Sequence, residues 1–303
     1  MISITRASSF STIQDGGRVG FMSSGVPRAG AMDLLTLHTL NAMVGNDANA
    51  AAIEWALTGG EIAFSDRTSF ALGGAGASAK LNDTSVDPYR AYLASPGDKL
   101  VVEGVTKGRF LYITFSGGID TPPVMKSRST YLPGGFGGLE GRRLKTGDEI
   151  PVAAQKRARH MVLDALPLSL RPDYTTSMIR IVANGDASEI TRGEFSISPS
   201  SDRMGYRLAG QMIFGGAGVT STGMCPGTIE LPPGGEPIVL MADAPTIGGY
   251  RIVGCVATVD LGRFAQLTPG AVVKFEEITV EAAQRLLIAE DHRLEAIRDW
   301  ALG

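Results

Sequence analysis

Two stretches of the chain carry apolar residues at the spacing of an α-helix. The first lies between Asp33 and Gly45, and its apolar positions are Leu34, Leu37, Leu40 and Val44. Asp33 is a favourable N-cap and Gly45 a favourable stop, so the pattern predicts one helix here. The second begins after Thr279, and its apolar positions are Ala283, Leu286, Leu287, Leu294, Ile297 and Ala301. We expect Thr279 to cap this C-terminal helix and its apolar face to dock on the second half of the chain.

Between these helices the apolar residues come in short runs separated by turn residues. From Ala52 onward the sequence reads AAIEWAL, Gly59-Gly60, EIAF and SFALGG, a pattern typical of strands in an antiparallel meander. The composition agrees, because 39 of 303 residues are glycine and 16 are proline, whereas glycine usually makes up about 7% of a protein. Frequent turns favour many short strands over long helices, so the sequence predicts a mainly β fold.

The sequence also contains an internal repeat. VDPYRAYLASPG at 86–97 aligns without gaps on VDLGRFAQLTPG at 259–270, at an offset of 173. IEWALTGGE from Ile53 resembles IELPPGGE from Ile229 at an offset of 176, and the methionines of GAMD and DRMG match at an offset of 172. Three matches in the same order at nearly one offset indicate a duplicated β-rich unit.

The repeat sets the expected domain organisation. We predict a first β domain at 1–116, a connecting and loop segment at 117–172, and a second β domain with the C-terminal helix at 173–303. The middle segment has no counterpart in the other half, and a loop segment this long is more often functional or mobile than inert. The two similar domains are expected to face each other.

Charge and rare residues exclude several functions. The chain has 28 Lys and Arg against 31 Asp and Glu, a net charge of −3, and so lacks the basic excess of a nucleic-acid-binding protein. Cys225 and Cys255 cannot form a disulfide framework, and His38, His160 and His292 lie far apart, which disfavours most zinc sites and Ser-His-Asp catalysis. Neither a signal-peptide core nor the run of about 18 apolar residues of a membrane span is present. We expect a reduced cytoplasmic protein that works through carboxylates, arginines, hydroxyls and backbone amides, without a metal site.

The segment most promising for chemistry is TIQDGGRVGFMSSGVPRAGAMD at 12–33. Its Asp15 and Arg18 offer an acceptor and a two-pronged donor among glycines that allow close approach of the backbone. In the second copy, SPSSDRMGYRLAG brings Asp202 and Arg203 to the equivalent place. The structural alternative, which the sequence leaves open, is a turn held by a hydrogen bond from Asp to backbone and by an Arg salt bridge.

Several long motifs resemble the KipA family, also called allophanate hydrolase subunit 2. They are TIQDGGRVGF, GVPRAGAMD, GGIDTPPVMKSRSTYL, FGGLEGRRLKTGD, SDRMGYRL, GTIELPPGGEPIVLMADAPTIGGY and QLTPGAVVKF. The resemblance runs from about Thr12 to Phe275 and extends to the C subunit of bacterial 5-oxoprolinase and to a module of urea carboxylase. It implies two duplicated cyclophilin-like β-barrel domains related by pseudo-twofold symmetry.

The resemblance implies three possible functions. The first is the C subunit of an ATP-dependent 5-oxoprolinase, which activates the lactam of 5-oxo-L-proline for hydrolysis to L-glutamate and is inactive alone. Its partners would be a KipI-like B subunit, in a heterodimer or dimer of heterodimers, and a LamB/YcsF-like A subunit, with ATP and Mg²⁺ in the complex. The second is the carboxyltransferase subunit of a biotin-dependent urea or amide carboxylase. The third is a non-catalytic antagonist of a KipI-like kinase inhibitor.

Both enzymatic functions must overcome the resonance of an amide. Such a site needs an acceptor for the substrate N–H, donors for its carbonyl, and groups that stabilise charge developing on oxygen. We predict catalytic roles for Asp15, Arg18, Asp202 and Arg203. The predicted substrate-binding residues are Gln14, Asp33, Ser201, Glu230, Thr246, Gly248, Gly249 and Tyr250. The two copies are expected to contribute these residues to one cleft.

Overall fold

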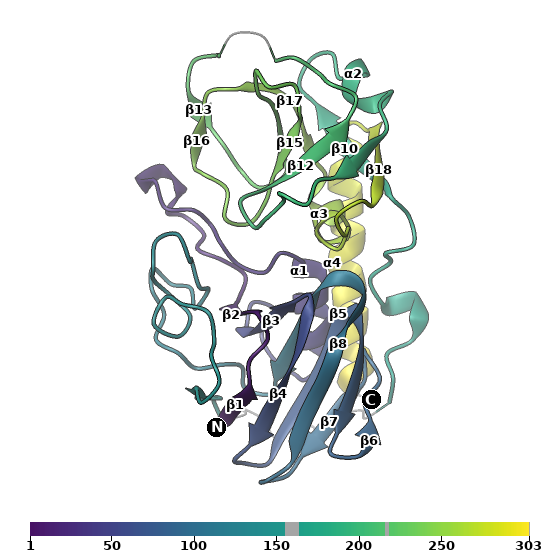
Figure 1. Ribbon diagram of the computed structural model, residues 1–303. Coiled ribbons are helices and arrows are strands. Elements are labelled where there is room, and N and C mark those ends of the chain that lie inside the picture. Colours follow the sequence, from purple (N-terminus) through teal and green to yellow (C-terminus); the bar gives the residue numbers. More distant parts are fainter. Residues whose placement is uncertain (155–163, 216–217, 303) are drawn as a thin grey trace. The chain divides into compact units, whose positions relative to one another are not determined.

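The computed structural model describes residues 1–154, 164–215 and 218–302, so His160 and part of the predicted connecting segment lie outside the described residues (Figure 1). The chain forms two compact units, and neither is one continuous stretch. Unit 1 comprises Met1–Arg18, Asp33–Pro172 and Asp291–Gly303, and unit 2 comprises Val19–Met32 and Asp173–Glu290. The boundaries at 116/117 and 172/173 stay a prediction, because a compact unit need not coincide with a domain of a duplicated chain.

Unit 1 is built on a nine-stranded sheet in which all strand pairs are antiparallel. The strand order is β2-β3-β8-β4-β1-β9, and β5 pairs with β6, β7 and β8. The strands are β1 (Ile2–Arg6), β2 (Phe10–Gln14), β3 (Ala52–Ala56), β4 (Thr58–Phe64), β5 (Thr68–Leu81), β6 (Thr84–Ser85), β7 (Ala91–Ala94), β8 (Lys99–Phe115) and β9 (Glu149–Ile150). The described strands leave β2 and β9 at the ends of the order, so this sheet is curled rather than closed.

The apolar runs after Ala52 do form antiparallel strands, but their order differs from a meander. Strand β8 is 17 residues long, and it pairs with β4 through its first half and with β3 through its second half. β3 and β4 therefore lie in line along one side of β8, separated by Leu57, whose φ of 69° interrupts the strand. A long partner strand explains why the two runs do not pair with each other.

The buried face of this sheet follows directly from strand alternation. Ile13, Ile53, Ile113 and Leu72 stand opposite one another on β2, β3, β8 and β5, and all belong to the apolar core of unit 1. The neighbouring residues on each strand point to the other face of the sheet. That second face carries the row of polar residues that includes Glu54 and Tyr112.

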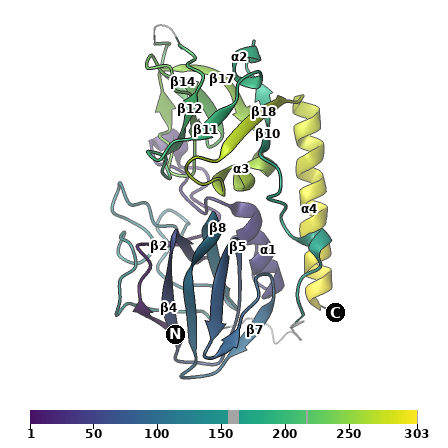
Figure 2. The same cartoon turned by 45° about the vertical axis from the view of Figure 1, so that its right-hand side comes forward.

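Both predicted helices are present. Helix α1 spans Leu34–Met43 and packs against β5 and β8 (Figure 2). Its N-cap Asp33 accepts a hydrogen bond from the backbone N–H of Thr36, and Gly45 after its end has a φ of 73°. Helix α4 spans Val280–Leu302, and the Thr279 hydroxyl accepts the N–H of Ala282 at 3.2 Å.

The apolar face of α4 does not dock on the second half along its whole length. Its buried residues Leu294, Ile297 and Ala301 lie in the part that belongs to unit 1. There Arg293 donates hydrogen bonds to the carbonyl of Leu170 and to Oγ1 of Thr39. The expected docking of the whole apolar face on the second half was therefore wrong. The helix has 23 residues, and its part from Asp291 onward belongs to unit 1.

Unit 2 is a closed barrel with the strand order β10-β17-β14-β15-β12-β11-β18. Its strands are β10 (Met178–Ala183), β11 (Phe195–Ile197), β12 (Gly205–Gly210), β14 (Thr228–Leu231), β15 (Ile238–Leu240), β17 (Arg251–Val256) and β18 (Val272–Glu277). The parallel pairing of β10 with β18 closes it. A separate ribbon pairs β13 (Thr222–Gly223) with β16 (Ile247–Gly248), and the remaining elements are α2 (Ser188–Thr191), α3 (Thr258–Ala265) and the 3₁₀ turns η1 (Met22–Ser24) and η2 (Leu168–Leu170).

The mainly β fold class is confirmed, with a closed barrel in unit 2 and a curled sheet in unit 1. Within the repeat, the Pro-Gly turn precedes β8 in one copy and β18 in the other, and Gly97 and Gly270 have φ of 91° and 84°. The residues before that turn differ, since they form β7 in the first copy and α3 in the second. The first segment pairs with β5, whereas in the second Asp260 accepts the backbone N–H and guanidinium of Arg180.

Candidate functional site

Asp15 lies directly after β2 and organises a loop that is distant in sequence. Its carboxylate accepts hydrogen bonds from the N–H of Gly17 at 2.8 Å, the hydroxyl of Ser127 at 2.6 Å, the N–H of Arg128 at 2.5 Å and the hydroxyl of Ser129. Asp15 is buried. Protein donors therefore occupy this carboxylate and hold residues 127–129 at the end of β2.

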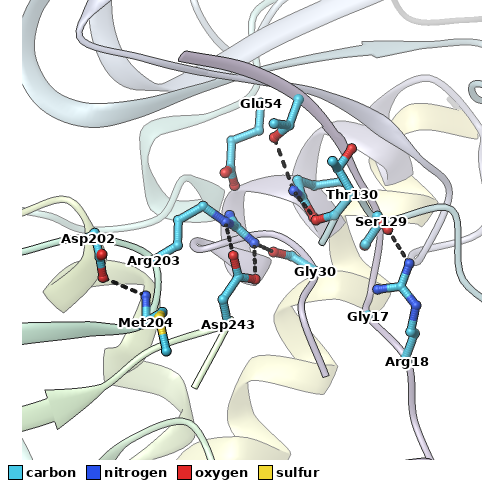
Figure 3. A network of polar contacts seen from close by, with 12 residues as sticks. Gly17, Arg18, Gly30, Glu54, Ser129, Thr130, Asp202, Arg203, Met204 and Asp243 are labelled. Carbon is cyan, nitrogen blue, oxygen red and sulfur yellow. Dashed lines mark hydrogen bonds and ion pairs between the residues drawn. The ribbon is translucent and has the colours of Figure 1, made fainter. Parts of the chain in front are cut away.

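Arg18 and Gln14 bind the same loop. Arg18 is completely buried and donates to the carbonyl of Ser129 (Figure 3). Its guanidinium lies 4.8 Å from the centre of the Phe136 ring. Gln14 donates from Nε2 to the carbonyl of Thr130 at 3.1 Å. Its Oε1 has no hydrogen-bond partner among the described residues. Gln14, Asp15 and Arg18 thus lie close together, in contacts that tie the end of β2 to the loop at 127–136.

A row of polar residues crosses the second face of the unit 1 sheet. Thr12, Glu54 and Tyr112 stand opposite one another on β2, β3 and β8. The hydroxyl of Tyr112 donates to Oε2 of Glu54 at 2.6 Å and accepts the N–H of Asp33 at 2.8 Å. Burial and the Glu54 carboxylate raise the pKa of Tyr112 well above its usual value. The phenol therefore stays protonated and serves as the donor that Glu54 needs.

In unit 2, Arg203 forms a two-pronged ion pair with Asp243. Its Nε and Nη2 each donate to the Asp243 carboxylate at 2.9 Å, and Nη2 also donates to the carbonyl of Gly30 at 2.7 Å (Figure 3). The side chains are 15% and 4% exposed. Asp202 is exposed and accepts the N–H of Met204 at 2.8 Å within its own turn. The salt bridge of the structural alternative is therefore present, with Asp243 as the partner instead of Asp202 or Asp15.

Glu230 differs from the other predicted residues because it is a buried carboxyl without a polar partner. It lies on β14, is 6% exposed, and makes no hydrogen bond or ion pair with any residue in the described ranges. Its register neighbours are Ile238 on β15 and Ile252 on β17. A Cβ built on Gly248 would come within 2.6 Å of both Glu230 Oε1 and the Met224 methyl group. Removal from water raises the pKa of Glu230.

The remaining predicted residues of the second copy surround the β13-β16 ribbon or the turn before β12. The carbonyl of Thr246 accepts the N–H of Met224, and the carbonyl of Gly249 accepts the N–H of Val219, each at 2.9 Å. Tyr250 is exposed, and the Ser201 hydroxyl accepts the N–H of Arg207 at 3.0 Å. The predicted residues of unit 2 therefore lie in two places, and a single cleft formed by both copies stays a prediction.

Sequence reasoning missed the pairing of the two cysteines. Cys225 precedes β14 and Cys255 lies on β17, where Cys255 stands opposite Thr228. Cys225 is exposed, and its sulfur lies 3.5 Å from Oγ1 of Thr228. A hydrogen bond from the Cys255 thiol lowers the pKa of Cys225 to about 6, and the same bond together with burial raises the pKa of Cys255. A spacing of 30 residues gives no sequence signal for this contact.

Cys225 is expected to be alkylated rapidly by iodoacetamide at pH 7, with the rate rising through a midpoint near pH 6. The thiolate is the reactive form, and the thiol of an ordinary cysteine has a pKa of about 8.5. Replacing Cys255 by alanine removes the hydrogen bond and should move the midpoint upward. Mass spectrometry of samples quenched between pH 5 and 9 measures both rates. An identical midpoint in wild type and Cys255→Ala would show that Cys255 does not control the thiolate.

Two structural features lie outside the predicted site. Unit 1 has a cavity of about 460 Å³ lined in part by Met1, Arg67, Ser69, Leu93 and Ser116, and none of the predicted site residues lines it. The cavity therefore gives no support to the predicted residues.

Among the helices that the structure describes, none has the length and apolar character needed to cross a membrane.

Comparison with known proteins identifies the family. A family model described as carboxyltransferase domain, subdomain A and B, matches residues 24–277. The chain belongs to this carboxyltransferase family. The match covers most of both units, including Arg203, Asp243 and Glu230.

Relatives of this carboxyltransferase domain fall into two groups. The chain is 37% identical over 294 residues to the C subunit of 5-oxoprolinase from Escherichia coli, covering 93% of both chains. It is 29% identical to urea amidolyase of Lachancea kluyveri, covering 99% of this chain and 18% of that protein. The crystal structure of the K. lactis urea amidolyase matches with a TM-score of 0.91 at 28% identity, over 98% of this chain and 20% of that one. The chain therefore corresponds to nearly a whole protein in one group and to about a fifth of a longer protein in the other.

Proposed function

We propose that this chain is the C subunit of an ATP-dependent 5-oxoprolinase. The observation that supports this most directly is its similarity to the Escherichia coli protein over nearly the full length of both chains. In the proposed complex it works with a KipI-like B subunit, as a heterodimer or dimer of heterodimers, and with a LamB/YcsF-like A subunit. Together they activate the lactam of 5-oxo-L-proline and hydrolyse it to L-glutamate in the cytoplasm.

In this proposal ATP and Mg²⁺ act in the complex, and we assign no step of phosphate chemistry to a residue of this chain. Within the described ranges, no group of three His, Cys, Asp or Glu side chains is placed to hold a metal ion. What the chain offers instead is hydrogen-bonding groups that can orient an amide.

The role proposed for Asp15, Arg18 and Arg203 is to hold the loops that carry these hydrogen-bonding groups in place. Asp15 and Arg203 are engaged by protein partners, and Arg18 is completely buried. Side chains that are already bound by several protein groups are better suited to positioning a loop than to contacting the substrate. Their direct participation in catalysis stays a prediction.

The proposed function is tested by co-expressing the chain with the LamB/YcsF-like and KipI-like partners. ATP-dependent formation of glutamate from 5-oxoproline is expected only when all three proteins are present. Omitting each protein in turn provides the controls. Turnover by this chain alone would contradict its assignment to a complex, and failure of the three-protein mixture to form glutamate would contradict the substrate assignment.

A second candidate function is transfer of a carboxyl group to urea or another amide. The observation that favours it is the similarity to the urea amidolyase structure over 98% of this chain. Under this alternative, activity depends on bicarbonate and a biotin carrier and does not need the LamB/YcsF-like partner. The third possibility, an antagonist of a KipI-like inhibitor, is distinguished by tight binding to that partner without any ATP-linked turnover.

A further inference from the structure

The repeat places two glutamates at matching positions with different surroundings. Glu54 and Glu230 follow the isoleucines that align in IEWALTGGE and IELPPGGE, and they lie on β3 and β14. Glu54 stands opposite Tyr112, whose hydroxyl occupies its carboxylate at 2.6 Å. Glu230 stands opposite Ile252. The second copy therefore keeps the buried acid but lacks the residue that supplies its hydrogen bond.

A buried polar group without a partner costs free energy, so its retention calls for a reason. The residues that face Glu230 come from four segments and are all uncharged: Met224, Ile238 on β15, Gly248 on β16 and Ile252 on β17. Removal from water is the cause of the shifted pKa of Glu230, and no neighbouring charge contributes to it. Apolar surroundings of this kind favour the neutral carboxylic acid, which offers one O–H donor and one C=O acceptor on the same edge.

Gly248 is the residue without a side chain among those that face Glu230. A Cβ on residue 248 would lie 2.6 Å from Glu230 Oε1, so a larger residue there would displace the Glu230 carboxyl group. The β13-β16 ribbon that carries it is held by only two register pairs, Thr222↔Gly248 and Gly223↔Ile247. Ile247 and Tyr250 beside it are exposed. The acid therefore lies beside a glycine and beside Met224, which belongs to a small apolar cluster that Ile238 and Ile252 pack against.

We propose that Glu230 is a binding residue for the cis amide edge of a lactam or urea, pairing through two reciprocal hydrogen bonds beneath the β13-β16 ribbon. In a lactam ring the N–H and C=O lie on the same side, so the carboxylic acid can donate to the carbonyl while accepting the N–H. A trans amide, as in a peptide, cannot make this pair. The proposal rests on the proposed function for its substrate class and specifies which part of the chain would recognise it.

The test uses the full chain labelled with ¹³C at its methionine methyl groups, with the Met224 signal assigned from a Met224→Leu variant. Titration with 2-pyrrolidinone is expected to shift this signal. N-methyl-2-pyrrolidinone, which lacks the N–H, should bind at least about tenfold more weakly, because it loses one hydrogen bond and adds a clash. Equal binding of the two lactams, or no shift of the Met224 methyl signal, would overturn the proposal.

Variants at position 230 separate recognition from folding. Glu230→Gln keeps a donor and an acceptor on one edge, so it should bind 2-pyrrolidinone at every pH, whereas binding by wild type should weaken as pH rises through the pKa of Glu230. Glu230→Leu should lose binding by about tenfold or more. Glu236→Gln, on the same hairpin, is the matched control and should bind as wild type does. Binding by Glu230→Leu at the wild-type level, or a pH-dependent Glu230→Gln, would contradict the assigned role.

Thermal unfolding verifies that these variants fold. Because burial raises the pKa of Glu230 above its unfolded value, the folded protein is most stable below the unfolded pKa, where the acid is neutral, and it loses stability as pH rises through the folded pKa. Above that pH, Glu230→Gln and Glu230→Leu should unfold no earlier than wild type. Lactam binding with an inactive three-protein mixture would count against the proposed function alone, whereas an active mixture without lactam binding at Met224 would count against Glu230 alone.

Discussion

Replacing Asp15 by alanine is expected to lower the free energy of unfolding of unit 1 by about 4 kcal/mol, since the change leaves several buried donors without a charged acceptor. The donors are two backbone N–H groups and the hydroxyls of Ser127 and Ser129. Urea denaturation monitored by circular dichroism measures the loss. The effect is large because one carboxylate serves four donors.

Asp202→Ala provides the matched control for Asp15→Ala. Asp202 also accepts backbone N–H groups after a turn, but it is exposed and both N–H groups belong to its own turn. Its replacement should cost roughly 1 kcal/mol, the usual net contribution of such a hydrogen bond. Equal losses for the two variants would mean that the contacts of Asp15 with residues 127–129 contribute little. An Asp15→Asn protein of wild-type stability that forms an inactive complex would instead support a catalytic role for this carboxylate.

Replacing Arg203 by alanine should be the second large effect, at about 3 to 5 kcal/mol, because it leaves the buried Asp243 carboxylate without its cation. Asp243→Ala should cost a similar amount for the same reason. The double variant should lose much less than the sum, since neither charge is then left alone in the interior. If the double variant lost as much free energy of unfolding as the two single variants together, this would contradict the coupling expected from the 2.9 Å contacts.

Arg203→Lys distinguishes a structural from a ligand-binding arginine. An ammonium cannot donate to both oxygens of Asp243 and to the carbonyl of Gly30 with the same geometry, so a lower unfolding temperature is expected. Arg207→Lys, at an exposed position of the same segment, is the control and should leave the unfolding temperature unchanged. If Arg203→Lys unfolds at the wild-type temperature but the assembled complex loses turnover, Arg203 contacts substrate.

The parts of the structure that the sequence predicted are those set by local rules. The Asp33 cap, the stop at Gly45 and the Thr279 cap each depend on residues within a few positions of one another, and all three are present. The apolar runs after Ala52 are strands for the same reason. The interruption at Leu57 escaped prediction, because it depends on how a distant 17-residue strand pairs with both runs.

The partners of the candidate site residues could not be predicted, because they are far away in sequence. Asp15 meets a loop more than 110 residues later, and Arg203 pairs with an aspartate 40 residues later. The sequence motifs suggested Asp202 or Asp15 as the salt-bridge partner of Arg203, whereas the structure pairs Arg203 with Asp243. Glu230 was included because GTIEL and TIGGY contain glycines that permit close approach, yet its lack of a partner is visible only in three dimensions.

The division of the chain into interleaved units has a consequence for synthesis on the ribosome. Residues 19–32 belong to unit 2, but the rest of that unit begins only at Asp173. The carbonyl of Gly30 is bound by an arginine that lies 173 residues later, which takes about 10 to 35 s to synthesise at typical rates. Unit 1 also requires residues from 291 onward. Neither unit can be completed before residues up to about 290 have emerged, so the 19–32 segment of a nascent chain has to wait for its partners in unit 2.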